Sequence, residues 1–191
     1  MILADVGEIG IYYKGREIIL RPSLYAMSRI ADKKTIVEIF SYVMSGDHAY
    51  SLLVIQACTD EDISDIYGMY ELVDDELLFY DGEVSKEETI IIAQSLLKHG
   101  LIGDVERKQE AKTTKSYTPE FDAKSYVSAV VAHLGISERE AWNMTMTSIA
   151  GALQAKFPPI EKSENFPTVE EAINASNWLD EVNKKRGNTW K

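Results

Sequence analysis

Residues 135–159 read GISEREAWNMTMTSIAGALQAKFPP, and the prediction of the fold starts from this stretch. Ser137 and Glu140 have the spacing of a capping box, in which each side chain satisfies a free backbone N–H group at a helix start. Pro158 and Pro159 cannot continue a helix. The pattern therefore predicts one amphipathic helix between the capping box and the two prolines.

The predicted helix has two different faces. At about 100° per residue, one face carries the larger apolar side chains: Trp142, Thr145, Met146, Ile149, Ala152, Leu153 and Phe157. The opposite face is small and lightly charged. Two interpretations stay open: an ordinary core helix with a polar back, or a helix whose back, or whose aromatic end, docks another helix. In the second case Asn143, Thr147 and Gly151 are the candidate partner-binding residues.

Further helices are expected on both sides of this one. Residues 118–120, TPE, are typical of a helix start, and Gly135 ends that helix, so a short turn predicts an antiparallel helical hairpin. Thr168 and Glu171 form another capping box. Trp178 falls off the apolar stripe of the helix behind it, which indicates either partial packing on a neighbour or an exposed aromatic anchor for a partner.

The N-terminal half predicts a β-hairpin followed by helices. Residues 8–21, EIGIYYKGREIILR, alternate in the manner of two strands, with the turn at Lys14-Gly15. Because a two-stranded hairpin is marginal alone, we expect it to lie on helices. Apolar residues recur at helical spacing in residues 24–30 and 36–44. Two further helices are predicted, one starting at a cap at Asp47 and one at the capping box of Ser85 and Glu88. Residues 69–80 are compatible with a helix or a strand.

Residues 104–118, DVERKQEAKTTKSYT, are polar and predict a linker. The expected organisation is an N-terminal hairpin plus helical domain at 1–103, this linker, and a C-terminal three-helix module at 119–191. The predicted fold class is thus mainly α, with an N-terminal β-hairpin packed on a helical domain and followed by a C-terminal helical module. The chain of 191 residues is long enough for each part to have its own core.

The charge and the cysteine content limit which partners and which cellular compartment are expected. The net charge is −11, and residues 1–103 hold 8 Lys/Arg against 18 Asp/Glu. An acidic half repels phosphate, so we expect no nucleic-acid partner. Cys58 is the only cysteine, which fits a reducing cytoplasm. No signal peptide and no apolar run of about 20 residues is found, so no membrane partner is expected.

The sequence carries no recognisable catalytic or metal-binding pattern. His48, His99 and His133 are far apart, and none stands in a metal-ligand spacing. The acidic runs at 60–62 and 74–76 lack the EF-hand pattern. A nucleophile elbow, a phosphate-binding glycine loop and a dinucleotide fingerprint are also missing from the sequence. We therefore predict no catalytic residue, no cofactor, no metal site and no enzymatic activity.

Two segments resemble the tail assembly chaperones of long-tailed bacteriophages. Within residues 7–45, a short hairpin runs into residues 20–24, LRPSL, and a helix, which is similar to the opening of those proteins. Residues 135–145, GISEREAWNMT, followed by Ala152-Leu153, are similar to a Gly-x-Ser-x-x-Glu-(Ala/Phe)-Trp-x-Met-Thr stretch in that family. The two segments together cover about a third of the chain.

The resemblance implies a non-enzymatic role in virion morphogenesis. Such a chaperone binds the helical tape-measure protein, or another helical virion protein, and keeps it soluble in the host cytoplasm before the tail tube polymerises. Small modules suit this task, because helix-in-groove docking covers apolar stripes and many weak contacts along one rod build avidity. Self-association is compatible with this role. The alternative is a helical adaptor or regulatory protein unrelated to virion assembly.

Overall fold

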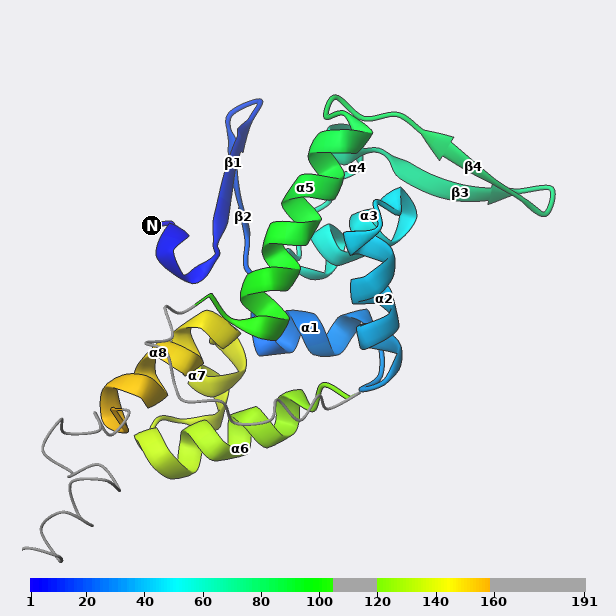
Figure 1. Ribbon diagram of the computed structural model, residues 1–191. Coiled ribbons are helices and arrows are strands. Elements are labelled where there is room, and N and C mark those ends of the chain that lie inside the picture. The colour runs from blue at the N-terminus through cyan, green and yellow to red at the C-terminus, as the bar shows by residue number, and fades with distance from the viewer. Residues whose placement is uncertain (105–119, 159–191) are drawn as a thin grey trace, which may run out of the picture. The chain divides into compact units, whose positions relative to one another are not determined.

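The computed structural model describes residues 1–104 and 120–158, which belong to one compact unit, Met1–Pro158 (Figure 1). Its elements in chain order are η1 (Ala4–Val6), β1 (Ile9–Tyr13), β2 (Arg16–Leu20), α1 (Leu24–Ile30), α2 (Thr35–Met44), α3 (His48–Ala57), α4 (Ser64–Tyr67), β3 (Met69–Val73), β4 (Glu76–Tyr80), α5 (Lys86–Leu97), η2 (Lys98–Ile102), α6 (Ala123–Leu134), α7 (Glu138–Asn143) and α8 (Met146–Lys156). Helix α3 packs against both α5 and α1.

The predicted N-terminal hairpin is confirmed. Strand β1 pairs with β2 in antiparallel register, with Ile9 opposite Leu20. Lys14 and Gly15 both have positive φ, 44° and 81°, as a type I′ turn requires. Ile18 and Leu20 are fully buried in the helical core. Their burial explains why this short hairpin is stable on the helices.

A second antiparallel hairpin forms from β3 and β4, where the sequence left helix and strand open. Asp74 and Asp75 make its turn with φ of 49° and 64°. Aspartate accepts this left-handed conformation better than most residues, although the usual turn signal at the second position is glycine. Because no glycine stands at this position, the sequence signal for the turn is weak. Figure 1 shows that this hairpin extends away from the helices.

The predicted caps in the described residues are confirmed. Ser85 with Glu88 and Ser137 with Glu140 each form a complete capping box at the starts of α5 and α7. Asp47 caps α3, where its carboxylate accepts the Tyr50 N–H at 3.0 Å. These contacts span only three residues, so the local sequence is sufficient to predict them.

The single helix predicted between Ser137 and the prolines is wrong. Helix α7 ends at Asn143, and Met144 and Thr145 are extended, with ψ of 148° and 160°. Thr145 then caps α8 by accepting the Ser148 N–H at 3.1 Å. The Met144 carbonyl accepts the N–H of Leu24 at 2.9 Å instead of an intrahelical donor. A cap and a tertiary hydrogen bond therefore replace one turn of regular helix.

The predicted fold class is wrong in describing a separate C-terminal helical module. Helices α6 and α7 contact α1, and α8 contacts η2. Val130, Ala141 and Ile149 are buried in the same core as Leu24 and Leu96. The physical reason is that the apolar stripes of α6 and α8 are covered by the N-terminal helices, so they do not form a core of their own.

The start of α6 shows how this joining occurs. The Phe121 N–H donates to the Lys33 carbonyl at 2.8 Å, and the Lys33 ammonium pairs with Asp122. Asp122, rather than residues 118–120, caps the helix. Most of the predicted linker, and the helix predicted behind Thr168, lie outside the described residues. The predicted domain boundaries therefore stay a prediction.

Two partly buried histidines join elements that are distant in the sequence. The Nδ1 atom of His48 lies 3.0 Å from the Tyr70 hydroxyl, and Nδ1 of His99 lies 2.9 Å from Oγ1 of Thr147. Burial is the main cause that lowers the pKa of each imidazole below its ordinary value of 6.5. The positive charge of Lys86 also lowers the pKa of His48.

We expect the stability of the protein to fall as the pH drops from about 7.5 to 5.5. The pKa of each histidine is lower in the folded chain, so the unfolded chain binds protons first. The contribution of each histidine to stability is complete only well above pH 6.5, the ordinary pKa of an unfolded imidazole, and it is lost as the pH falls through the lower folded pKa. Urea unfolding measured across this range gives the free energy of unfolding at each pH. This free energy should depend less on pH in the double variant His48→Asn/His99→Asn than in the wild type. His133→Asn, at the exposed surface, is the control and should keep the wild-type slope.

Candidate functional site

Residues 20–24 and 135–145, which are far apart in the sequence, meet in the structure. The Leu24 N–H donates to the Met144 carbonyl at 2.9 Å, and Ser23 forms an antiparallel β-bridge with Thr145. Ser23 and Thr145 are both buried, and each caps the helix that follows it. The start of α1 and the break between α7 and α8 are therefore held in one fixed arrangement.

An open groove lies beside this junction, and we call it the α1–α7 groove. Tyr25 and Ser28 of α1, and Glu138, Arg139, Trp142 and Asn143 of α7, line it. Tyr25 is 53% exposed, whereas Trp142 is half-buried against the edge of the core. Two aromatic side chains bordered by polar groups are typical of a protein interface.

The polar rim of the groove is held by local contacts within α7. The Asn143 side-chain amide donates to the Arg139 carbonyl at 3.0 Å, and the Trp142 indole N–H approaches the Glu138 carboxylate at 3.4 Å. The second distance is long for a hydrogen bond, so it restrains the indole only weakly.

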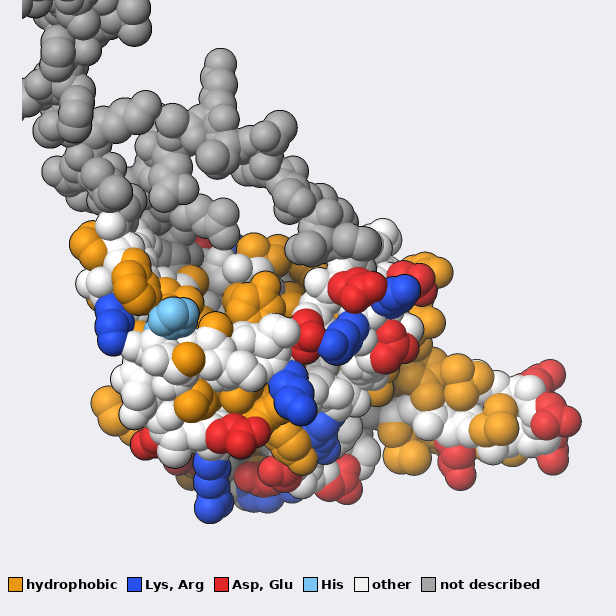
Figure 2. All heavy atoms as spheres, turned by 90° about the horizontal axis from the view of Figure 1, so that it is seen from below, with side chains coloured by type: hydrophobic (Ala, Val, Ile, Leu, Met, Phe, Trp, Pro, Cys, Tyr) orange, Lys and Arg blue, Asp and Glu red, His pale blue; other side chains and the backbone are white. Residues whose placement is uncertain are grey.

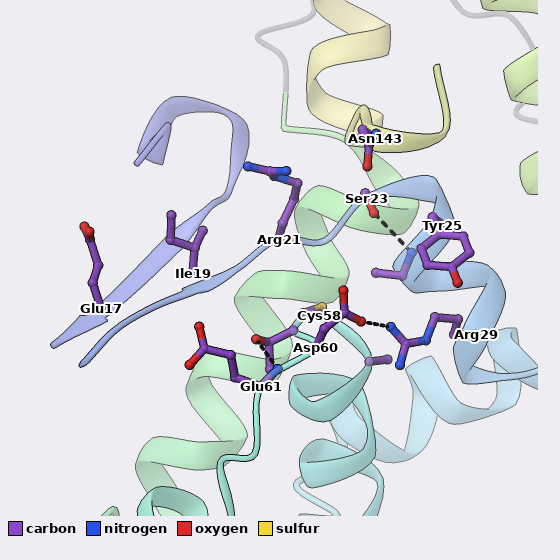
Figure 3. A pocket seen from close by; sticks show the side chains of 13 residues that line it. Glu17, Ile19, Arg21, Ser23, Tyr25, Arg29, Cys58, Asp60, Glu61 and Asn143 are labelled. Atoms are coloured by element: carbon purple, nitrogen blue, oxygen red, sulfur yellow. Dashed lines mark hydrogen bonds and ion pairs between the residues drawn. The ribbon is translucent and has the colours of Figure 1, made fainter. Parts of the chain in front are cut away.

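A cleft of about 340 Å³ adjoins the groove and shares Tyr25 and Asn143 with it (Figure 3). Figure 3 shows Glu17 and Ile19 of β2 on one side and Tyr25 and Arg29 of α1 on the other. The remaining lining comes from Arg21, Ser23, Ala26 and the end of α3 with the loop behind it: Ala57, Cys58, Thr59, Asp60 and Glu61. The cleft is thus lined by three segments of the N-terminal half, namely β2, α1 and the end of α3 with its following loop, together with Asn143.

Both arginines of the cleft are engaged by carboxylates. Arg29 pairs with Asp60 at 2.7 Å and stacks over the Tyr25 ring at 5.7 Å from its centroid. Arg21 pairs with Glu8 at 2.5 Å, and the buried Glu8 carboxylate also accepts the Leu3 N–H at 2.9 Å. These pairs balance the positive charge, so the cleft is not arranged to bind an anion.

Cys58 at the cleft is a buried thiol. Burial raises the pKa of Cys58 to about 12, so the thiol is protonated at neutral pH. Within residues 1–104 and 120–158, no three His, Cys, Asp or Glu side chains are placed to hold a metal ion. The chemistry that these two hollows offer is recognition by aromatic contact and hydrogen bonding.

The structure separates the residues that the sequence proposed for partner binding. Asn143 is exposed in the groove. Thr147 is buried, where its hydroxyl lies 2.9 Å from His99 and accepts the Asp104 N–H at 2.9 Å. Gly151 is half-buried on α8, and Trp178 lies outside the described residues. The break at Met144 and Thr145 is the reason that no single face contains the three predicted positions.

The sequence interpretation missed the two aromatic walls of the groove. Tyr25 falls off the stripe formed by Leu24, Met27 and Ile30, and this offset was an available signal of exposure. Trp142 was placed on the buried stripe of an unbroken helix. Because α7 ends one residue later, the side chain lies at the edge of the core instead.

The comparison with protein families identifies the chain as a member of one of them. The profile described as "Family of unknown function (DUF6246)" matches residues 44–172, more than half of the chain, and the chain belongs to this family. No curated protein and no solved structure matches it significantly. The matched range includes α7 and the β3–β4 hairpin, whereas Tyr25 and Ser28 precede it. Among the helices described, none has the length and apolar composition needed to cross a membrane.

Proposed function

We propose that this protein is a non-enzymatic tail assembly chaperone of a long-tailed bacteriophage. It binds the helical tape-measure protein and keeps it soluble in the host cytoplasm before the tail tube polymerises. One observation supports this proposal most: the two segments that resemble that family, at residues 20–24 and 135–145, are in direct backbone contact. They meet beside the α1–α7 groove, where Trp142 and Asn143 of the second segment are lining residues and Tyr25 directly follows the first segment.

The groove has the features that helix-in-groove docking requires. Tyr25 and Trp142 offer partly accessible aromatic area between two helices, and Arg139 and Asn143 offer polar contacts at the rim. An unassembled tape-measure protein exposes apolar stripes that aggregate unless they are covered. Several copies of a small chaperone along one rod gain avidity from weak individual contacts, and the tail tube is then able to displace them.

We expect co-expression with the tape-measure protein of the same genome to give a soluble complex that is recovered by pull-down. Apolar burial drives this contact, so recovery should be similar at low and high salt. Tyr25→Ala should reduce the soluble fraction of the partner. Tyr42→Ala is the matched control, because Tyr42 is a similarly exposed tyrosine on α2 outside the groove.

The outcomes of this experiment are distinct. An insoluble tape-measure protein and no complex at either salt would reject the chaperone role. A complex that forms equally well with Tyr25→Ala would reject the groove as its contact surface. A complex that disappears at high salt would show that the acidic half binds the partner by charge.

A further inference from the structure

The β3–β4 hairpin carries exposed apolar side chains away from the helices. Leu72 and Leu77 are cross-strand partners near its outer end and are 68% and 61% exposed. Figures 1 and 2 show the hairpin projecting from the rest of the described residues. Within residues 1–104 and 120–158, each strand pairs with only one neighbour, so no described strand covers the two outer edges. A two-stranded ribbon of this size is marginal without a covering surface.

The base of the hairpin is fixed. Tyr70 and Phe79 pair across the strands with ring centroids 4.9 Å apart. His48 of α3 packs edge-on against Phe79 at 4.7 Å and contacts the Tyr70 hydroxyl. In the alternation of the strands, these two aromatics share a face with Leu72 and Leu77. The inner half of this face is covered by the protein itself, whereas the two leucines of the outer half are not.

The charge of the hairpin is of one sign. Residues 69–81, MYELVDDELLFYD, contain five acidic and no basic side chains. None of these carboxylates forms an ion pair with another of the described residues. Figure 2 shows the acidic groups gathered toward the tip. The other hairpin differs, because Lys14 pairs with Glu83 at 3.0 Å and Arg16 with Asp65 at 2.8 Å.

We propose that the outer half of the β3–β4 hairpin is a docking element for a basic amphipathic helix of a partner protein. The apolar side of that helix covers Leu72 and Leu77, and its Lys and Arg side chains face the carboxylates around the turn. A second copy of the hairpin is disfavoured as the occupant, because two surfaces of equal negative charge repel each other. This surface is separate from the α1–α7 groove, so the proposal does not rest on the chaperone role.

The test uses a fluorescein-labelled synthetic helix of leucine and lysine at amphipathic spacing, titrated with the full chain in a fluorescence anisotropy assay. Leu72→Thr/Leu77→Thr should weaken binding about tenfold while threonine keeps the strand propensity. Asp74→Asn/Asp75→Gly should weaken binding several-fold at low salt, because it removes two charges and retains a type I′ turn sequence. Asp5→Asn/Glu38→Gln removes two exposed charges elsewhere and should bind like the wild type.

Several results would overturn the proposal. The first is that the wild-type chain does not bind the peptide. The second is that the leucine variant binds it as tightly as the wild type does. The third is that the Asp5→Asn/Glu38→Gln control loses as much affinity as the Asp74→Asn/Asp75→Gly variant does. Tyr25→Ala should keep the wild-type affinity for this peptide. A loss there, with the leucine variant unchanged, would assign the peptide to the groove and reject the hairpin. Failure of the tape-measure experiment leaves these outcomes unaffected.

Discussion

Gly68→Ala should lower the free energy of unfolding by about 3 kcal/mol or more, the largest effect that we expect from a single added methyl group. Gly68 has φ of 80° and ψ of −178°, a conformation that is almost restricted to glycine. A Cβ atom there would overlap the Tyr80 carbonyl oxygen and lie 2.9 Å from the Gly82 nitrogen. Both are backbone atoms, so neither is able to move as a side chain does.

Gly151→Ala is the matched control and should have the opposite sign. Gly151 lies within α8, and an added Cβ atom there would have no neighbour within 4 Å. Alanine is the better helix former, so this variant should gain about 0.5–1 kcal/mol. Urea unfolding followed by circular dichroism measures both variants. A neutral result for Gly68→Ala would contradict the close approach of the two chain segments at the base of the β3–β4 hairpin.

Leu24→Ala should cost about 2–5 kcal/mol of stability, the second largest effect. Leu24 is fully buried at the start of α1, among side chains from both halves of the described chain. Its backbone N–H also bonds to Met144, so the cavity lies where α1 meets the break between α7 and α8. The free energy of unfolding from urea titrations gives this cost directly.

Tyr25, the neighbour of Leu24, should matter little for stability and more for partner binding. Tyr25→Ala removes a half-exposed ring, so its stability should change by less than about 1 kcal/mol. If the proposed chaperone role is right and the α1–α7 groove is the contact surface, the same variant should lose solubilisation of the tape-measure protein. Equal stability losses for Leu24→Ala and Tyr25→Ala would show that the assignment of the buried face of α1 is wrong.

The features predicted correctly from the sequence depend on contacts between near neighbours. The capping boxes at Ser85 and Ser137 join residues three apart, and the turn at Lys14-Gly15 needs only one flexible position. The turn at Asp74-Asp75 has the same geometry, but its sequence signal is weaker because aspartate replaces glycine. The sequence therefore predicts the first hairpin and is compatible with either a helix or a strand at the second.

The candidate site was predicted only in part. Asn143 lies in the α1–α7 groove, but the helical face on which its selection rested does not exist. Tyr25 lies far from Trp142 in the sequence, and the two residues line one groove only because α1 packs against α7. Periodicity within one helix holds no information about which other helix covers it.

The sequence by itself determined where most helices and the first hairpin begin, because caps and turns satisfy backbone groups within a few residues. The tertiary structure alone decided that α6–α8 share one core with the N-terminal helices. It also decided the break at Thr145, a residue that fits the interior of a helix or the cap of a new one. Thr145 caps a new helix because the Met144 carbonyl accepts a hydrogen bond from the N–H of Leu24. This donor reaches Met144 only when the two halves of the described chain pack together.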